Sequence, residues 1–510
     1  MAPRLLALAP LRTEAIALGL GQACDAADIE VHRTGMGLAS AARRATALAA
    51  LAAGGGARAY AAVAVAGLGG ALAEDLTPGD LVVADRLITA AGHEVARLAS
   101  APLLAAELSR LGLTARTGTI VSTDHIVTGA ERATLRALGA VAVDMESTAI
   151  AGAGWELPIA VVRSISDSEN EELFSPAGVR GALRGLRSLR ASRPALARWA
   201  AAVKPREVLL AEPRSFCAGV DRAVQVVERA LERYGPPVYV RRQIVHNAHV
   251  VSRLEAAGAV FVQELREVPD GATVVFSAHG VAPSVQEEAA NRSMFSIDAT
   301  CPLVSKVHNE ARRFAASGRQ VVLVGHAGHD EVEGTLGTVP GTVLVTTAGD
   351  VGALGIDPTR PTAVVTQTTL ATDEVGAVVE ALAARFADLA TPAASDICYA
   401  SQNRQEAVRA MAPDCDLVLV VGSANSSNSN RLVEVAQRSG PQAHLIDNKD
   451  GLRLAWLENA VRVGITAGAS APDQLVQEVV ECLAGMGPVS VSERSTGNER
   501  VSFPLPLEVR

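Results

Sequence analysis

The stretch EVLLAEPRSFCAGVDRAVQVV, residues 207–227, places Cys217 between an apolar strand-like run and a helix-like run. The same junction recurs around Cys301 in MFSIDATCPLVSKVHNEA (294–311) and around Cys398 in ASDICYASQNRQEAVRA (394–410). A thiolate at such a junction lies in the positive field of a helix N-terminus, which lowers its pKa and favours metal ligation. The recurrence therefore predicts three lobes that share one metal centre.

Composition is that of a globular protein with several domains. The chain has 510 residues, of which 49% are hydrophobic and 20% charged, and this length corresponds to about three domains. The net charge of −9 argues against a nucleic-acid binder, because phosphate contacts need a basic surface. No apolar run reaches about 18 residues and arginines interrupt the N-terminal apolar segment, so we expect no membrane span, no signal peptide and a cytoplasmic location.

The six cysteines are too scattered along so long a chain to form a disulfide framework. Cys24, Cys415 and Cys482 lack polar, glycine-rich neighbours, and we expect them to be small buried hydrophobic residues. Only the three junction cysteines are candidates for metal ligation.

Three segments follow one another along the chain, and the predicted fold class is α/β. Residues 1–185 alternate strand-like runs with alanine-rich helical runs, as in an α/β sheet domain. Residues 186–206 carry arginines without an acid and predict a basic helix and linker; a polyanion site is the less favoured interpretation. Residues 207–510 resume the alternation of strands and helices and contain the three cysteine junctions.

Polar side chains cluster where the strand-like runs of the second half end. In open α/β sheets this edge is where ligands bind. A single histidine or serine there is more often structural, but several at converging strand ends indicate a binding site. The candidates are His246, His279, His329, Glu331, Thr368, Ser426, Ser427, Asn428 and Ser470.

Two of these loops, SSNSNR and GASAP, have the form of an anion site. Hydroxyl and backbone N–H groups at a helix start favour phosphate, while plain helix capping by serine or asparagine is the structural alternative. Combined with three histidines and few arginines, the loops predict a compact diphosphate held by hydrogen bonds.

Three cysteines leave a [4Fe–4S] cluster one thiolate short. Such a site exposes one iron to substrate as a Lewis acid and electron donor. A zinc ion with three sulfur ligands is the competing interpretation, and the spacing of the cysteines does not decide between them.

Motifs with a shared order and spacing run through residues 207–505: PRSFCAGVDRA, YVRRQIVHN, FSAHGV, DATCPLVSKVH, GHAGHDEVEGT, TQTTL, DICYASQNRQEAV, GSANSSNSNRL and TAGASAPDQLV. This part of the chain resembles the 4-hydroxy-3-methylbut-2-enyl diphosphate reductase family. The resemblance implies a three-lobed α/β domain around a central [4Fe–4S] cluster. It also implies reductive dehydroxylation to isopentenyl and dimethylallyl diphosphate, the last step of the non-mevalonate isoprenoid pathway, with ferredoxin or flavodoxin as electron donor.

The resemblance assigns roles position by position. Glu331 would be the proton donor or relay, with His329 and Thr368 near the allylic hydroxyl of the substrate. Asp330 and Ala424 depart from the proline and the lysine familiar at these positions, without removing a ligand. The implied cluster ligands are Cys217, Cys301 and Cys398, and the implied diphosphate ligands are His246, His279, Ser426, Ser427, Asn428 and Ser470.

Softer motifs occur in the first half: RTGMGLASAARRA, VAGLGGAL, GDLVVAD, GTIVSTDHIV, VAVDMESTAIA and AVVRSISD. They resemble the nucleoside phosphorylase and nucleosidase superfamily over residues 1–185. The resemblance implies that Met145 and Glu146 contact a ribose and that Asp167 protonates a purine as the glycosidic bond breaks. The structural alternative is that Asp167 and Ser166 cap the following helix.

The acceptor of such a glycosyl transfer is either phosphate or water. Phosphorolysis requires cationic phosphate ligands, for which Arg33, Arg43 and Arg44 are the candidates. Without them, water would be the acceptor.

A second class of function is a nucleoside phosphorylase whose C-terminal domain is a cluster-binding redox sensor or scaffold. A sensor has no use for Glu331, Thr368 or the diphosphate ligands, so their presence favours a reductase.

Overall fold

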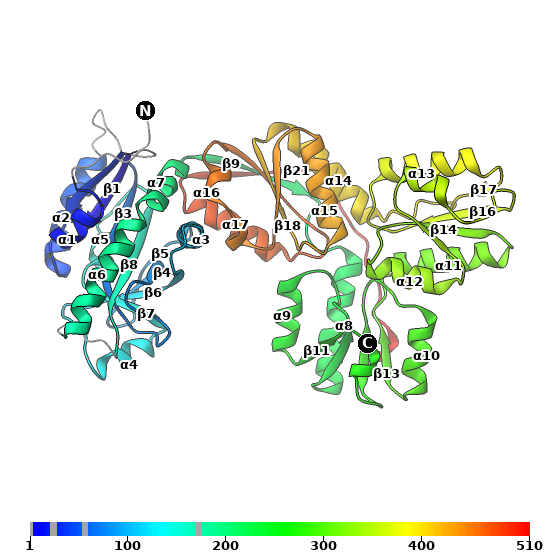
Figure 1. The fold of residues 1–510 in the computed structure, drawn as a ribbon, viewed down its shortest axis with the longest axis horizontal. Helices are drawn as coiled ribbons and strands as arrows, with labels where there is room; N and C mark the ends of the chain where they lie inside the picture. Colours follow the sequence, from blue (N-terminus) through cyan, green and yellow to red (C-terminus); the bar gives the residue numbers. More distant parts are fainter. Residues whose placement is uncertain (1–3, 21–27, 54–59, 170–174) are drawn as a thin grey trace. The chain divides into compact units, whose positions relative to one another are not determined.

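The computed structural model describes residues 4–20, 28–53, 60–169 and 175–510. They divide into two compact units. Unit 1 contains residues 1–208, 448–463 and 477–491, and unit 2 contains residues 209–447, 464–476 and 492–510. Both units are built from strands that alternate with helices, which confirms the predicted α/β class (Figure 1).

Unit 1 is built on an eight-stranded sheet in the order β2-β1-β3-β7-β6-β4-β5, with β8 paired to β3 and β4. The pairings run from β3 through β7, β6, β4 and β8 back to β3, so this part of the sheet closes on itself. Its strands are β1 (Arg4–Ala9), β2 (Asp28–Arg33), β3 (Tyr60–Ala71), β4 (Leu81–Thr89), β5 (Glu94–Arg97), β6 (Ala115–Ser122), β7 (Ala140–Asp144) and β8 (Ile159–Asp167).

Alanine, valine and leucine side chains from these strands form the unit 1 core, in which Leu6, Val63, Val82 and Val161 are fully buried. The helices are α1 (Arg12–Ala17), α2 (Leu38–Ala53), α3 (Ala101–Arg110), α4 (Glu131–Arg136), α5 (Ser147–Ala151), α6 (Pro176–Ala191), α7 (Arg193–Ala202) and the short α16 (Leu454–Leu457).

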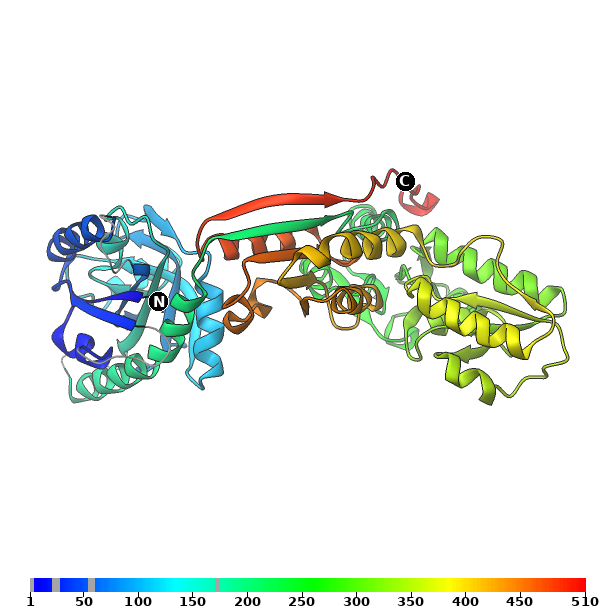
Figure 2. The same ribbon diagram turned by 90° about the horizontal axis from the view of Figure 1, so that it is seen from above.

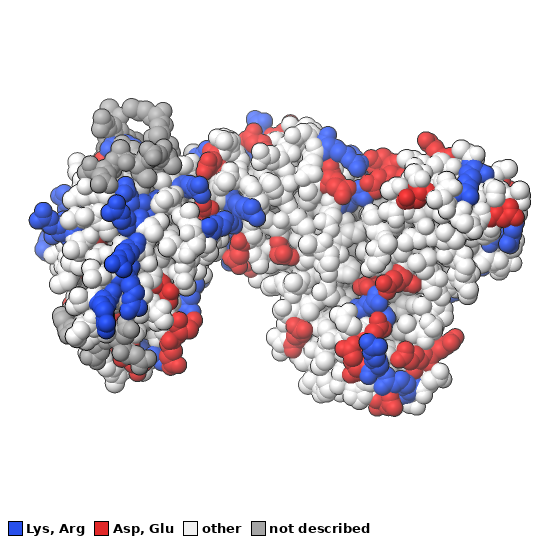
Figure 3. Space-filling view, in the orientation of Figure 1, with Lys and Arg blue, Asp and Glu red and all other residues white. Residues whose placement is uncertain are grey.

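Helix α6 explains the basic character of the segment that precedes residue 206. A Cβ on its Gly181 would lie 2.2 Å from the carbonyl oxygen of Ser166, so glycine lets the helix lie directly on β8. The arginines of α6 lie on the opposite, exposed face, and Figure 3 shows Lys and Arg gathered in this region. Residues 186–206 contain the end of α6 and the whole of α7. The predicted domain boundaries at residues 185 and 206 stay predictions.

Unit 2 draws on three sheets, as the three cysteine junctions predict. Their orders are β11-β10-β12-β13, β15-β14-β16-β17 and β19-β18-β20-β9-β21. Every strand pair of the first two sheets is parallel. Parallel strands put their carboxyl ends at one edge, where the polar loops follow.

The strands of these sheets are β9 (Arg206–Glu212), β10 (Val238–Arg241), β11 (Ala259–Val262), β12 (Thr273–Phe276), β13 (Phe295–Asp298), β14 (Gln320–Val324), β15 (Val343–Val345), β16 (Thr362–Thr366), β17 (Leu389–Ala390), β18 (Leu417–Val421), β19 (Gln442–Ile446), β20 (Arg462–Ala467) and β21 (Val489–Ser495). Figure 2 shows β21 beside β9, its neighbour in the third sheet. Strands β9, β20 and β21 each have residues in both units.

The accompanying helices are α8 (Ala218–Tyr234), α9 (Ala248–Ala256), α10 (Pro283–Asn291), α11 (Pro302–Ala316), α12 (Asp330–Thr338), α13 (Thr372–Arg385), α14 (Tyr399–Met411), α15 (Ser427–Arg438) and α17 (Asp473–Ala484). Within the described part of the chain, no helix combines the length and apolarity that a bilayer crossing needs.

Candidate active site

The three junction cysteines are all helix N-caps. Cys217 precedes α8, Cys301 precedes α11 and Cys398 precedes α14. The Sγ atom of Cys398 accepts a hydrogen bond from the backbone N–H of Ser401 at 3.3 Å. Local sequence therefore places each thiol at the first turn of a helix.

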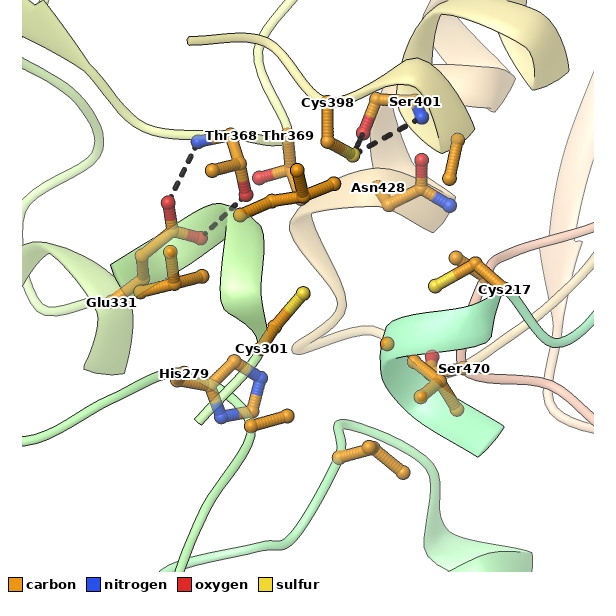
Figure 4. A pocket seen from close by; sticks show the side chains of 18 of the residues that line it. Cys217, His279, Cys301, Glu331, Thr368, Thr369, Cys398, Ser401, Asn428 and Ser470 are labelled. Atoms are coloured by element: carbon orange, nitrogen blue, oxygen red, sulfur yellow. Dashed lines mark hydrogen bonds between the residues drawn. The ribbon is translucent and has the colours of Figure 1, made fainter. Parts of the chain in front are cut away.

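One cavity of unit 2, with a volume of about 100 Å³, collects the predicted site (Figure 4). All three cysteines line it, together with every other residue predicted for the second half. These are His246, His279, His329, Glu331, Thr368, Ser426, Ser427, Asn428 and Ser470.

Gly219 is a site residue that sequence reasoning missed. A Cβ at this position would lie 2.6 Å from the Sγ atom of Cys301 and 3.8 Å from that of Cys217. Glycine thus keeps the space between two thiols free of side chain. The sequence signal was the Cys-Ala-Gly stretch at the first cysteine junction, in which Gly219 follows Cys217 by two positions.

Thr369, Tyr399 and Phe503 also line the cavity and were not predicted. The hydroxyl of Thr369 donates to the Ser427 hydroxyl at 3.0 Å, which links two of the predicted loops. Thr369 lies within TQTTL and could have been found there, whereas nothing in the tail sequence distinguishes Phe503.

The pKa values of two thiols contradict the expectation drawn from the helix field. Burial, together with the neighbouring thiols, raises the pKa of Cys301 to about 12 and that of Cys398 to about 11. The cost of burying a thiolate exceeds the favourable effect of a helix N-terminus. These thiols need a bound cation to ionise, since metal ligation and thiol deprotonation are coupled.

Glu331 lies buried beside the cavity, with 3% of its surface exposed. Its carboxylate accepts hydrogen bonds from the Thr368 backbone N–H at 2.7 Å and from the Thr368 hydroxyl at 3.0 Å (Figure 4). Burial raises the pKa of Glu331 to about 7, despite these hydrogen bonds. A carboxyl group with this pKa is suited to hold and donate a proton near neutral pH.

The three predicted histidines form a cluster. The rings of His246 and His279 stack at 4.0 Å, and the His329 ring lies edge-on to both, at 5.1 and 5.7 Å. Burial lowers the pKa of each histidine, that of His329 to about 4, so the imidazoles are neutral. His329 Nδ1 accepts the Glu331 backbone N–H at 3.1 Å.

Several polar atoms in the cavity have no hydrogen-bond partner in the protein. They are Nε2 of His246, Nδ1 of His279 and both side-chain polar atoms of Asn428. Buried polar groups are nearly always hydrogen-bonded, so a ligand or an ordered water would satisfy these atoms.

The serine loops combine capping with cavity lining. Ser426 is the N-cap of α15 and accepts the Ser429 backbone N–H at 3.3 Å, as the capping alternative predicts. The Ser470 hydroxyl donates to the backbone carbonyl of His246 at 2.9 Å. Both serines also line the cavity, so capping does not exclude a ligand.

Two groups of residues in unit 2 have the chemistry to hold a metal. The first is the set of three thiols. The second is His246, His279 and Asp330, whose potential ligand atoms all lie within 4.8 Å of one another.

A separate cavity in unit 1, about 160 Å³ in volume, contains the residues predicted for the first half. Met145, Glu146 and Asp167 line it. Asp167 forms an ion pair with Arg132 and accepts the Ser166 hydroxyl at 2.6 Å. It is therefore held by side chains at the end of β8.

Glu146 and Glu14 supply two further carboxylates to this cavity. Glu146 accepts the Gly37 backbone N–H at 2.9 Å and lies 3.7 Å from Arg163. Glu14, which sequence reasoning missed, is 2% exposed and accepts the Leu68 backbone N–H at 2.8 Å. Burial raises the pKa of both acids.

The three arginines proposed as phosphate ligands do not line this cavity. Arg33 ends β2, Arg43 and Arg44 lie on α2, and all three side chains are exposed. No described lining residue of the cavity is an arginine or lysine.

The remaining cysteines differ in burial. Cys482 is fully buried, as expected, whereas Cys415 is half-buried. Cys24 lies outside the described residues.

Family models match both halves of the chain. The family model described as LytB protein matches residues 208–484, and the Phosphorylase superfamily model matches residues 24–184. Residues 24–184 are thus phosphorylase-like, as the motifs of the first half predict.

Curated relatives and a solved structure match the second half. The 4-hydroxy-3-methylbut-2-enyl diphosphate reductase of Bordetella pertussis is 58% identical over 301 residues, which are 59% of this chain and 93% of that protein. The protein of the same name from Mycolicibacterium paratuberculosis is 58% identical over 313 residues, or 61% of this chain and 94% of that protein. The solved E-1-hydroxy-2-methyl-but-2-enyl-4-diphosphate reductase of Plasmodium falciparum is 35% identical with a TM-score of 0.58, and covers 60% of this chain and 97% of that one. Because the family model spans more than half of its residues, the chain belongs to the LytB protein family.

Proposed function

We propose that unit 2 reduces 4-hydroxy-3-methylbut-2-enyl diphosphate to isopentenyl diphosphate and dimethylallyl diphosphate. The reaction breaks the allylic C–O bond, forms a C–H bond and releases water, so it consumes two electrons and two protons. The observation that carries the proposal is the single cavity lined by three thiols, a buried carboxyl group and a cluster of unpartnered polar atoms.

Cys217, Cys301 and Cys398 would hold one [4Fe–4S] cluster per chain. The residues fit such a group because three half-buried cysteines line one cavity and Gly219 leaves the space between two of their thiols free. When bound, the cluster supplies electrons and a Lewis-acidic iron. Zinc, the competing metal, has no redox chemistry, so the reductive reaction favours the cluster.

The unpartnered atoms of the cavity would bind the diphosphate. Neutral imidazoles of His246 and His279 can each direct an N–H toward an anion, and the Asn428 amide can donate as well. Ser426 and Ser427 add hydroxyls at the start of α15, where the helix dipole favours negative charge. Ser470 lies beside His246 and donates a hydrogen bond to its backbone carbonyl.

Glu331 would provide a proton to the departing hydroxyl. Its raised pKa keeps a large part of the carboxyl groups protonated near pH 7, and the Thr368 hydroxyl lies within hydrogen-bond distance. Thr368 would orient the substrate hydroxyl toward the acid, with His329 next to them in the same cavity.

The electrons would come from a small carrier such as ferredoxin or flavodoxin. The second half carries no glycine-rich fingerprint for a nicotinamide nucleotide, so we infer a protein donor rather than NADPH.

The test is an anaerobic preparation of the full chain, assayed for iron, sulfide and turnover. We expect about four iron and four sulfide per chain, and consumption of the hydroxy diphosphate with dithionite-reduced viologen. A colourless protein, or a brown one that leaves the substrate unchanged, would refute the proposal.

We also propose that unit 1 cleaves a purine nucleoside, with water as acceptor. Met145, Glu146, Asp167 and Glu14 line its cavity, and Arg33, Arg43 and Arg44 do not. The test is release of adenine from adenosine and methylthioadenosine, with and without phosphate. Adenine release that requires phosphate would contradict hydrolysis, and no release from either nucleoside would refute the activity.

A further inference from the structure

Arg242, the residue that follows β10, has an unusual backbone conformation. Its φ is +59°, in the left-handed region that residues other than glycine rarely adopt. Its backbone N–H donates to the carbonyl of Val262 at 2.6 Å, which fixes the conformation. Such outliers persist where surrounding contacts over-determine them, often at functional sites.

The Arg242 side chain lies among three carboxylates. It forms an ion pair with Asp330, lies 2.6 Å from Oε2 of Glu333 and lies 3.4 Å from Oε1 of Glu264. Asp330 is the first residue of α12, directly before Glu331. The guanidinium thereby connects the end of β10 to the helix that carries the proposed acid.

Asp330 also faces the proposed diphosphate site. Its Oδ2 atom lies 3.9 Å from Nε2 of His246 and 3.9 Å from Nδ1 of His279. These are the same imidazole atoms that have no hydrogen-bond partner. A diphosphate bound to them would have a carboxylate as its neighbour.

The occupant of these imidazoles is therefore an anion only if the charge of Asp330 is offset. A divalent cation on His246, His279 and Asp330 is the other occupant that the geometry allows. Arg242 already pairs with Asp330, and a paired carboxylate is a poor metal ligand and a tolerable neighbour for an anion.

We propose that Arg242 is a positioning residue for the substrate, which holds Asp330 and offsets its charge so that a diphosphate can occupy His246 and His279. This inference rests on the proposed function of unit 2. Without Arg242, the half-buried carboxylate of Asp330 and the exposed carboxylate of Glu333 would repel the diphosphate, which weakens substrate binding more than it slows the chemical step.

The test compares Arg242→Ala with Arg242→Ala/Asp330→Asn in the full-length, anaerobically purified holoenzyme. We expect Arg242→Ala to raise KM by about tenfold or more, with kcat changed by less than about threefold, since the lost interaction stabilises the bound substrate and the transition state equally. The second substitution removes the unpaired charge and should return KM to within about threefold of the original value.

Arg241→Ala is the matched control. This neighbouring arginine pairs with Glu264 at 2.8 Å but makes no ion pair with Asp330. Adding Asp330→Asn to Arg241→Ala should not lower KM, because Arg241 forms no ion pair with Asp330. A KM unchanged in Arg242→Ala, or raised and not restored by Asp330→Asn, would overturn the proposal.

Titration with inorganic pyrophosphate gives a second readout that does not depend on turnover. Asp330→Asn alone should bind pyrophosphate at least as tightly as the unaltered protein, and this variant keeps the proposal testable if Arg242→Ala does not fold. Weaker pyrophosphate binding, or tight binding of Zn²⁺ that Asp330→Asn abolishes, would show that Asp330 serves as a ligand and would overturn the proposal. An unaltered protein that binds pyrophosphate and does not consume the hydroxy diphosphate would instead refute the proposed function.

Discussion

The cavities of unit 1 and unit 2 are both lined by residues that the sequence singles out, but they satisfy their polar groups differently. In the unit 2 cavity, His246, His279 and Asn428 have buried polar atoms without partners. In the unit 1 cavity, Asp167 pairs with Arg132, and Glu146 lies close to Arg163. No described residue that lines the unit 1 cavity has an unpartnered buried side-chain atom.

The two cavities thus differ in whether their buried polar groups already have partners in the protein. Unpartnered donors cost stability until a ligand arrives, so they point to the ligand's chemistry. Paired acids are stable without a ligand, and their pairing alone does not distinguish a catalytic site from a structural network. The chemistry of unit 2 is therefore read more directly from its geometry than that of unit 1.

The largest expected effect is the loss of the metal centre in unit 2. Cys301→Ser removes a thiol that lines the cavity, and we expect the protein to lose its iron, its brown colour and all turnover. Cys415→Ser, which alters a half-buried thiol outside the cavity, is the matched control and should keep its iron. Full iron content in Cys301→Ser would mean that the three thiols are not the ligand set.

Glu331→Gln should separate proton transfer from cluster binding. We expect kcat to fall by about 100- to 10,000-fold, because the amide keeps the shape but cannot donate the proton. Iron, sulfide and the visible spectrum should stay unchanged. Glu287→Gln, at an exposed acid on α10, serves as the control, and normal turnover in Glu331→Gln would contradict the proton role.

Asp167→Asn tests the proposed acid of the unit 1 cavity. We expect adenine release to fall about 100-fold with reductase turnover unaffected, since the residue lines only the unit 1 cavity. Arg132→Ala should lower adenine release as well if the ion pair positions the acid. If both variants release adenine as fast as the unaltered protein, the ion pair between Asp167 and Arg132 is a structural contact and not part of a catalytic site.

The pH dependence of reduction should follow Glu331. Its pKa is raised to about 7, so the proton-bearing form dominates below that value and is lost as the pH rises through it. We expect kcat to fall by about tenfold per pH unit above about pH 7, and the residual rate of Glu331→Gln not to show this fall. A kcat that rises with pH across this range would contradict the assignment of Glu331 as an acid.

Asn428→Ala should produce the smallest effect and the sharpest contrast with a paired residue. The amide has no protein partner, so its removal should raise the free energy of unfolding by ~1 kcal/mol while KM rises about tenfold. Thermal unfolding and steady-state kinetics measure the two quantities. A destabilised variant with unchanged KM would show that the amide serves the fold.

Sequence reasoning named residues that meet in the unit 2 cavity because their signals are local. A cysteine between a strand and a helix becomes an N-cap, and polar loops at parallel strand ends meet at one edge. Features that depend on tertiary packing were missed or misjudged. The thiol pKa values rise through burial, which no local pattern reports, and Gly219 matters only because Cys301 arrives from another lobe.

The same limit applies to the boundary between the two halves. Residues 448–463 and 477–491 group with unit 1, although they follow the unit 2 motifs in the sequence. Hydrogen bonds between segments far apart in the sequence accompany this grouping. In one of them the Glu207 backbone N–H donates to the Val461 carbonyl at 3.0 Å. Such long-range pairing leaves no mark in either segment alone.

The interleaved course of the chain has a practical consequence for gene dissection. A stop codon after residue 206 would remove two segments that belong to unit 1, and a gene that starts at residue 207 would carry those segments without the rest of it. Point substitutions in the intact polypeptide test the two proposed activities without cutting β9, which begins at Arg206 and has residues in both units.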